Sequence, residues 1–194
     1  LAAAGVVRDA RRRAAPALAA RIEAHLRELA MPTASVDVSV GGEAGQDVAL
    51  LLSANSGAPL LPLARVASGG ELARAMLAVR RVLTASPPTQ VFDEIDAGVG
   101  GEVAHAVGAS LADLATGSQV LVVTHLAQVA AYAHSQVLVT KDDDGTVAVA
   151  RVHLLDDAER VVELSRMLSG SPDSGTAREH VAELLAVAAA VRDA

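Results

Sequence analysis

The chain has 194 residues, of which 52% are hydrophobic, so it is long enough for one compact domain with a core and a short appendage. It contains no cysteine, which excludes disulfides and thiolate metal ligands, and no apolar run approaches the ~20 residues of a membrane span. Its net charge of −7 and its single Tyr and single Phe argue against a main nucleic-acid surface, which needs clustered basic and aromatic side chains.

Residues 1–30 are predicted to form a basic helix. They hold six arginines against three acidic residues, a net charge of +3. Apolar residues recur on one face at helical spacing, at Leu18, Ile22, Leu26 and Leu29. Pro16 either starts this helix or kinks a longer one. The stripe fits the end of a coiled-coil arm or an ordinary amphipathic surface helix. A start at Leu1 instead of a methionine suggests a fragment of a longer chain.

An α/β pattern follows the basic helix, and residues 31–194 are expected to form one lobe. Two β runs, over 35–40 and 48–52, predict a hairpin. Residues 70–84 place apolar side chains along one helical face, and a pair of prolines ends that helix.

Strands and helices alternate through the rest of the lobe. Short apolar strands are expected over 90–93, 119–124 and 136–141. Helical patterns separate them, over 102–115 and 126–133. This alternation implies an α/β fold with a mostly parallel sheet flanked by helices. A further strand and two helices close the chain, over 147–153, 156–168 and 176–192.

A Ser-Gly-Gly-Glu sequence leads directly into the helix over 70–84. In a structural interpretation Ser68 caps the helix and Glu71, three residues on, completes a capping box. In a functional interpretation Gly69 and Gly70 let backbone N–H groups approach an anion, with the helix dipole and the Ser68 hydroxyl directed at phosphate. These residues alone leave both interpretations open.

Adjacent carboxylates, Asp93 and Glu94, end the strand over 90–93 just ahead of a glycine-rich turn at 98–101. Ligands of α/β proteins bind at the carboxyl ends of parallel strands. Asp93 could hold a hydrated Mg²⁺ there, while Glu94, aimed elsewhere, orients or deprotonates an attacking water. A solvated acidic loop is the alternative.

The strand over 119–124 places His125 at its end. A single histidine is usually structural, but this one follows a strand that neighbours the Asp93 strand, where it could sense a γ-phosphate by hydrogen bonding. The other histidines lack metal-ligand spacing, so no zinc site is expected.

In this order the three motifs resemble the C-terminal lobe of ABC-type ATPases, and their wording resembles the RecN branch, a relative of the SMC proteins. The likeness rests on three stretches: Val66-Ala67-Ser68-Gly69-Gly70-Glu71-Leu72, Phe92-Asp93-Glu94-Ile95-Asp96-Ala97-Gly98-Val99-Gly100-Gly101 and Val123-Thr124-His125-Leu126-Ala127-Gln128-Val129-Ala130-Ala131. The Gly-Val-Gly-Gly turn, where SMC proteins have Ala-Leu-Asp, is the discriminating detail. Gln90 and Thr89 depart from the family pattern by making the Asp93 strand more polar.

The resemblance implies an SMC-like ATPase acting in recombinational repair of DNA double-strand breaks, with ATP and Mg²⁺ as cofactors. Asp93 would then bind Mg²⁺ through water, Glu94 would be the catalytic carboxylate of the Walker B motif, and His125 the switch residue. The signature motif, which contacts the γ-phosphate of ATP held mainly by a second head, would be Ser68, Gly69, Gly70 and Glu71. The turn at 98–101 stands in for the D-loop, whose usual aspartate is missing.

The sequence has no phosphate loop (Walker A), because the pattern G-x-x-x-x-G-K-[ST] needs a lysine and the only one, Lys141, is followed by Asp142. In the resembling family this loop lies near the N-terminus, beyond a long coiled coil, so residues 1–30 would be the end of the returning arm. The expected partners are an N-terminal half with the phosphate loop, a second head in a homodimer, and DNA bound by the full-length assembly. The protein would act in the bacterial cytoplasm at the nucleoid, without a membrane. This chain alone should bind ATP weakly or not at all.

Two alternatives remain open. One is another ABC-type ATPase, either an SMC-like chromosome protein or a transporter's nucleotide-binding subunit, although the glycine-rich turn and the arm-like helix speak against a transporter. The other is a non-catalytic interaction module. That module would show no ATP turnover when the two halves are combined, and no loss of function in Glu94→Gln.

Overall fold

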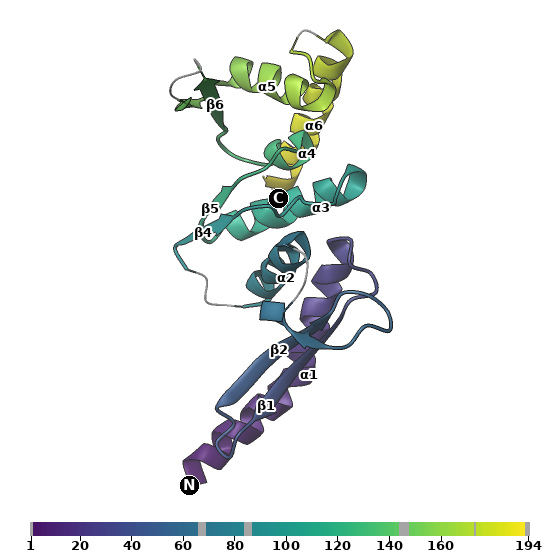
Figure 1. Cartoon of the computed structure of the whole chain (residues 1–194), viewed down its shortest axis with the longest axis vertical. Helices are drawn as coiled ribbons and strands as arrows, with labels where there is room; N and C mark the ends of the chain where they lie inside the picture. The colour runs from purple at the N-terminus through teal and green to yellow at the C-terminus, as the bar shows by residue number, and fades with distance from the viewer. Residues whose placement is uncertain (1, 66–68, 84–86, 144–147, 173, 193–194) are drawn as a thin grey trace. The chain divides into compact units, whose positions relative to one another are not determined.

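The computed structural model describes residues 2–65, 69–83, 87–143, 148–172 and 174–192. The chain forms two compact units, Leu1–Val123 and Thr124–Ala194 (Figure 1). Ser68, in the Ser-Gly-Gly-Glu motif, lies outside the described residues. Within the described ranges, no helix is both long and apolar enough to cross a membrane.

The first unit opens with a long helix that lies along a small antiparallel sheet (Figure 1). Helix α1 (Ala2–Glu28) continues through Pro16. The sheet has the strand order β1-β2-β3, with bounds Ser35–Gly41, Asp47–Ser53 and Leu61–Pro62, and the 3₁₀ turn η1 (Leu63–Arg65) follows it. The predicted hairpin is confirmed, with Val38 of β1 opposite Leu50 of β2.

Small side chains let α1 lie close to the hairpin. Ala15 and Ala19 pack on Val38 in a buried cluster. At the hairpin turn, a guanidinium nitrogen of Arg11 donates to the carbonyl oxygen of Gly45 over 2.7 Å. A Cβ added to Gly45 would lie 2.7 Å from the Cα of Arg8, and its φ of 70° also favours glycine. The absence of a side chain at Gly45 therefore allows the turn to lie against the helix.

Two helices and a parallel strand pair complete the first unit. Their bounds are Gly69–Val82 for α2, Thr89–Phe92 for β4, Gly101–Ala115 for α3 and Gln119–Val122 for β5. Strands β4 and β5 pair in parallel with Phe92 opposite Val122, and α3 supplies the crossover that a parallel pair needs. Helix α2 packs on both α1 and α3. The predicted helices over 70–84 and 102–115 are confirmed, although α2 ends at Val82 and residue 84 lies outside the described residues.

The second unit combines a one-turn helix, a hairpin and two longer helices. Their bounds are Ala127–Ala130 for α4, Val137–Asp143 for β6, Ala148–Leu154 for β7, Asp157–Ser169 for α5 and Gly175–Arg192 for α6. Helices α5 and α6 pack together through buried apolar side chains that include Leu164 and Val181. The two closing helices are where the sequence predicts them.

The mixed α/β class is confirmed, and the parallel pairing within the described residues joins β4 to β5. The third predicted strand, over 136–141, instead pairs antiparallel with β7, Val139 lying opposite Val152. The link from β6 to β7 is too short for the crossover that a parallel pair requires. The division into an arm over 1–30 and a lobe over 31–194 stays a prediction.

Candidate functional site

Asp93 and Glu94 follow the end of β4 as the sequence predicts. Both side chains are exposed, and Glu94 has a φ of 56°, in the left-handed region that non-glycine residues rarely adopt. Ile95 and Asp96 directly after them are buried. The amide of Ala97 donates to the carbonyl oxygen of Glu94 over 3.1 Å and so closes a tight turn. The buried residues thus anchor a turn that presents two carboxylates outward.

The N-terminus of α2 lies against this turn. A Cβ added to Gly69 would lie 3.0 Å from Oε2 of Glu94, and a Cβ added to Gly70 would lie 2.7 Å from the carbonyl oxygen of Ala97. The absence of side chains at these glycines is what allows the approach. A carboxylate beside the first turn of a helix is stabilised by the helix dipole. The first two motifs of the sequence are therefore brought together within one unit.

Arg74 ties α2 to the same turn from inside the unit. A guanidinium nitrogen donates to the carbonyl oxygen of Ala97 over 3.0 Å, and the residue is buried. Burial lowers the pKa of Arg74, and the nearby charge of Glu71 offsets this in part. Sequence reasoning missed Arg74. The signal was an arginine one turn from Gly70 and Ala78, on the face of α2 that is otherwise apolar.

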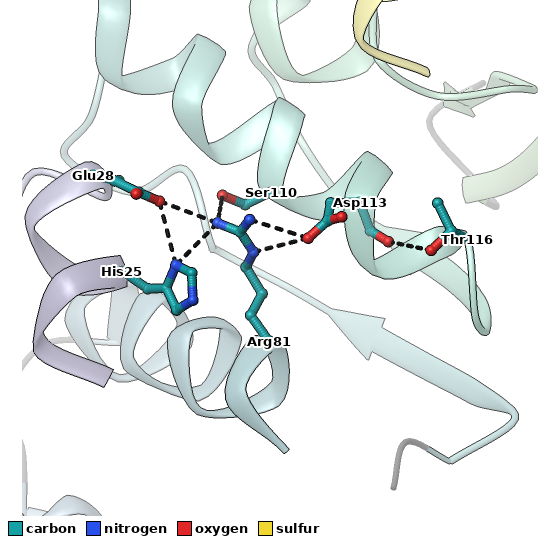
Figure 2. A network of polar contacts seen from close by, with 6 residues as sticks. All are labelled: His25, Glu28, Arg81, Ser110, Asp113 and Thr116. Atoms are coloured by element: carbon teal, nitrogen blue, oxygen red, sulfur yellow. Dashed lines mark hydrogen bonds and ion pairs between the residues drawn. The ribbon is translucent and has the colours of Figure 1, made fainter. Parts of the chain in front are cut away.

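The far end of α2 is held by a polar junction around Arg81 (Figure 2). The guanidinium lies 3.1 Å from Oε2 of Glu28 in α1 and 3.0 Å from Oδ2 of Asp113 in α3. It also donates to Oγ of Ser110 over 3.3 Å. Nδ1 of His25 lies 3.2 Å from the same guanidinium nitrogen that faces Glu28. Arg81 thus joins three helices, and α2 is fixed at both of its ends.

The polar residues of β4 have local partners. Gln90 is buried, and its Nε2 donates to Oγ of Ser118 over 2.9 Å. Ser118 in turn donates to the carbonyl oxygen of Leu114 at the end of α3. At the strand's start, the hydroxyl of Thr89 donates to Oε1 of Gln119 over 3.1 Å. The two polar residues of β4 therefore contribute hydrogen bonds that hold the strand to β5 and to the end of α3.

His125 belongs to the second unit and is exposed. It follows β5, whose continuation is tied to β4 by a 2.9 Å hydrogen bond from the amide of Val123 to the carbonyl oxygen of Phe92. The hydroxyl of Thr124 accepts from the amide of Leu126 over 3.1 Å, and this hydrogen bond turns the chain just before helix α4 begins. His125 thus lies in the short link between strand β5 and helix α4.

Asp93 and Glu94 suit a metal ion whose ligands come mainly from a bound substrate and from water. Within the described ranges no three Asp, Glu, His or Cys side chains converge as an all-protein metal site would require. Mg²⁺ bound to phosphates needs only one or two protein carboxylates and keeps several waters. The exposed Asp93, at the carboxyl end of a parallel strand, matches that simpler requirement.

The fold is shared with the head domains of SMC proteins. The Smc head with coiled coil and joint from Pyrococcus yayanosii superposes with a TM-score of 0.58 over 79% of this chain and 29% of that chain, at 22% identity. A structure from work on ATP-driven dimerization and DNA-stimulated activation of SMC ATPases gives a TM-score of 0.51 over 82% of this chain and 97% of that chain, at 21% identity. The class defined by these likenesses is that of proteins with the SMC head fold.

Sequence relatives narrow the class. The DNA repair protein RecN of Streptomyces coelicolor is 48% identical over 95% of this chain and 36% of its own length. RecN of Deinococcus radiodurans is 49% identical over 91% of this chain and 32% of its own length. No family model matches the chain. The chain belongs to the RecN family of DNA repair proteins, and it spans about a third of the length of these relatives.

Proposed function

We propose that this chain is the C-terminal half of an ATPase head that acts in recombinational repair of DNA double-strand breaks. It would supply the signature motif, the Walker B carboxylates and the switch histidine to an ATP site shared between two heads. The observation that carries the proposal is the approach of Gly69 to the carboxylate of Glu94. Two motifs that are separated in the sequence meet here at the carboxyl end of a parallel strand, where ligands of α/β proteins bind.

Each proposed role follows from the position of its residue. Asp93 would hold Mg²⁺ through water, and the ion would offset the charge of the transferred phosphate. Glu94 would orient or deprotonate the attacking water. The unusual backbone of Glu94 supports a functional role, since strained conformations cluster at active sites. His125 would sense the γ-phosphate by hydrogen bonding.

The signature glycines would serve the second head. Gly69, Gly70 and Glu71, together with Ser68, would present backbone N–H groups and the positive end of the α2 dipole to the γ-phosphate of ATP bound mainly by the partner head. In the isolated chain the carboxylate of Glu94 lies at this same helix end. ATP, which is also an anion, would compete for that position, so head engagement would free Glu94 for catalysis.

An N-terminal half with a phosphate loop would complete the site. The sheet of β4 and β5 supports this partner, because Val91, Leu121 and Val123 alternate onto one face and are 67%, 49% and 61% exposed. Apolar sheet faces of this kind are normally covered by further structure. Residues 1–30 would be the end of the coiled-coil arm that links the two halves, and DNA would be bound by the whole assembly at the nucleoid.

The decisive experiment is ATP hydrolysis by the complete protein with Glu94→Gln. Loss of a catalytic carboxylate should lower kcat by roughly 10²-fold or more while ATP binding persists. Glu102→Gln, which removes an exposed carboxylate in the first turn of α3, is the matched control and should leave kcat unchanged. This chain by itself should show no turnover. Equal kcat values for Glu94→Gln and Glu102→Gln would overturn the catalytic assignment and favour an interaction module.

A further inference from the structure

The helix that follows His125 is too short to hold itself. Helix α4 has four residues, and its N-cap, Leu126, makes no side-chain cap hydrogen bond. A single helical turn in water is unstable, because nucleation fixes several residues for few hydrogen bonds. The position of α4, and of the histidine two residues before it, therefore depends on contacts from elsewhere in the second unit.

Two arginines from other helices supply these contacts at the carboxyl end of α4. One guanidinium nitrogen of Arg160 in α5 donates to the carbonyl oxygens of Ala130, Ala131 and Ala133 over 3.0, 2.9 and 2.7 Å. Arg192 in α6 donates to the carbonyl oxygen of Ala133 over 2.7 Å and reaches that of Ala131 at 3.5 Å. These carbonyls lie at and just beyond the end of α4, where helical hydrogen bonding stops, and the carbonyl oxygen of Ala130 also accepts from the amide of Ala133 over 3.1 Å.

The burial of the charged Arg160 side chain costs free energy, and this distinguishes its contacts with the carbonyls from an ordinary surface contact. Arg160 is 8% exposed, and its Nε is buried without a partner in the described part of the chain. Burial lowers the pKa of Arg160, the charge of Arg192 lowers it further, and Asp157 offsets part of this effect. Two like charges thus converge on one pair of carbonyl oxygens, so α4 is fixed by α5 and α6 together.

Arg160 itself stands on a rigid support. Asp156 and Glu159 form a capping box at the start of α5, and Gly170 ends the helix in the left-handed conformation. Leu164, one turn after Arg160, is fully buried. A side chain that positions a functional group acts best from such an element.

We propose that Arg160 is a positioning residue for His125: by clamping the carboxyl end of α4, with help from Arg192, it sets where the histidine at the other end of that helix stands. This inference rests on the proposed function, in which His125 is the switch residue. The guanidinium does not touch the nucleotide. It restricts the histidine to one position, so that sensing of the γ-phosphate requires no further ordering of the loop.

The test compares Arg160→Met, Arg160→Lys and Arg192→Met in the complete protein. Hydrogen exchange of the amides over 129–133 reports the clamp directly, because these amides bond within the α4 turn. We expect Arg160→Met to speed this exchange about tenfold and to lower kcat about tenfold, with the KM for ATP within about twofold. Arg160→Lys keeps a charge with three donors and should restore part of both losses. Arg192→Met should act in the same direction, less strongly. Arg166→Met, which removes an exposed arginine of the same helix, is the control.

The background variant His125→Ala separates the possible outcomes. If Arg160 acts through His125, Arg160→Met lowers kcat no further in that background. An equal fall of kcat with and without His125, or unchanged exchange over 129–133 in both Arg160→Met and Arg192→Met, overturns the inference. A kcat that His125→Ala does not change removes the switch assignment itself. A kcat that depends on His125 but not on Arg160 removes only the inference about Arg160.

Discussion

Gly70 and Ala97 are in backbone contact, so close that a Cβ added to Gly70 would lie 2.7 Å from the carbonyl oxygen of Ala97. The same oxygen accepts from Arg74 over 3.0 Å. One carbonyl therefore joins the first turn of α2 to the turn after β4. This contact explains physically why a glycine stands at position 70, whatever ligand the site binds.

Gly70→Ala should destabilise the protein. The added methyl group meets backbone, which cannot swing away, so α2 and the turn have to separate. Overpacking of this kind costs about 1–3 kcal/mol in free energy of unfolding. Denaturant unfolding of this chain measures the loss, and Gly117→Ala is the control because a Cβ there has nothing within 4 Å. Equal stability of the two variants would contradict the contact.

Gly69→Ala should behave differently from Gly70→Ala. Its methyl group meets Oε2 of Glu94 at 3.0 Å, which is the far end of a flexible side chain. The carboxylate can rotate away, so the free energy of unfolding should change by less than about 1 kcal/mol. In the complete protein the displaced carboxylate should nevertheless lower kcat for ATP. A variant with normal stability and normal kcat would argue against contact between Gly69 and Glu94.

Arg81→Met should weaken the packing of α2 on α1 and α3. The side chain of Arg81 is 20% exposed and faces Glu28, Asp113 and Ser110. Exposed ion pairs contribute about 0–1 kcal/mol each, so the loss of this junction should cost about 1–2 kcal/mol. Arg80→Met, at the adjacent position, is the control and should stay within about 0.5 kcal/mol. A double-mutant cycle with Asp113→Ala should show coupling, and strict additivity would show that the pair contributes nothing.

Much of the fold was predictable because its local signals agree with its packing. The apolar pattern over 70–84 predicted a helix there, and Ala75, Val79 and Val82 of that pattern are buried in α2, whereas Leu83 beyond its end is exposed. The two β runs match the hairpin of β1 and β2. The position of Asp93 and Glu94 at the end of β4 was predictable because a carboxylate pair follows a short strand in the sequence. The features that the sequence could not predict depend on contacts between residues far apart in the chain. No local pattern identifies Arg81 or Arg160 as a residue that joins helices, because their partners lie on other elements. Likewise, the periodicity of a strand such as β6 does not determine which strand it pairs with.

The buried Gln90 predicts an asymmetry between two substitutions. Its Nε2 is paired with Ser118, whereas its Oε1 is buried without a partner among the described residues. Ser118→Ala should therefore cost about 1–3 kcal/mol in free energy of unfolding, because it leaves a second buried polar group unpaired. Gln90→Leu removes both groups and leaves Ser118 bonded to Leu114, so it should be neutral or slightly stabilising. If Gln90→Leu cost more than Ser118→Ala, the hydrogen bond would not explain why β4 carries a glutamine.

The start of α5 predicts a pH dependence of stability. The pKa of Glu159 lies below its usual value of 4.5, first because its carboxylate accepts from the amide of Asp156 and then because it accepts from His153. A carboxylate with a lowered folded-state pKa stabilises the protein above about pH 4.5, and this contribution is lost as the pH falls through the lower value. Between about pH 5 and pH 3 the melting temperature should therefore fall more steeply for the wild type than for Glu159→Gln. Glu183→Gln, an exposed carboxylate of α6, should keep the wild-type slope. If the melting temperatures of the wild type and Glu159→Gln fell equally steeply with pH, the capping box at the start of α5, and with it the support of Arg160, would not depend on the charge of Glu159.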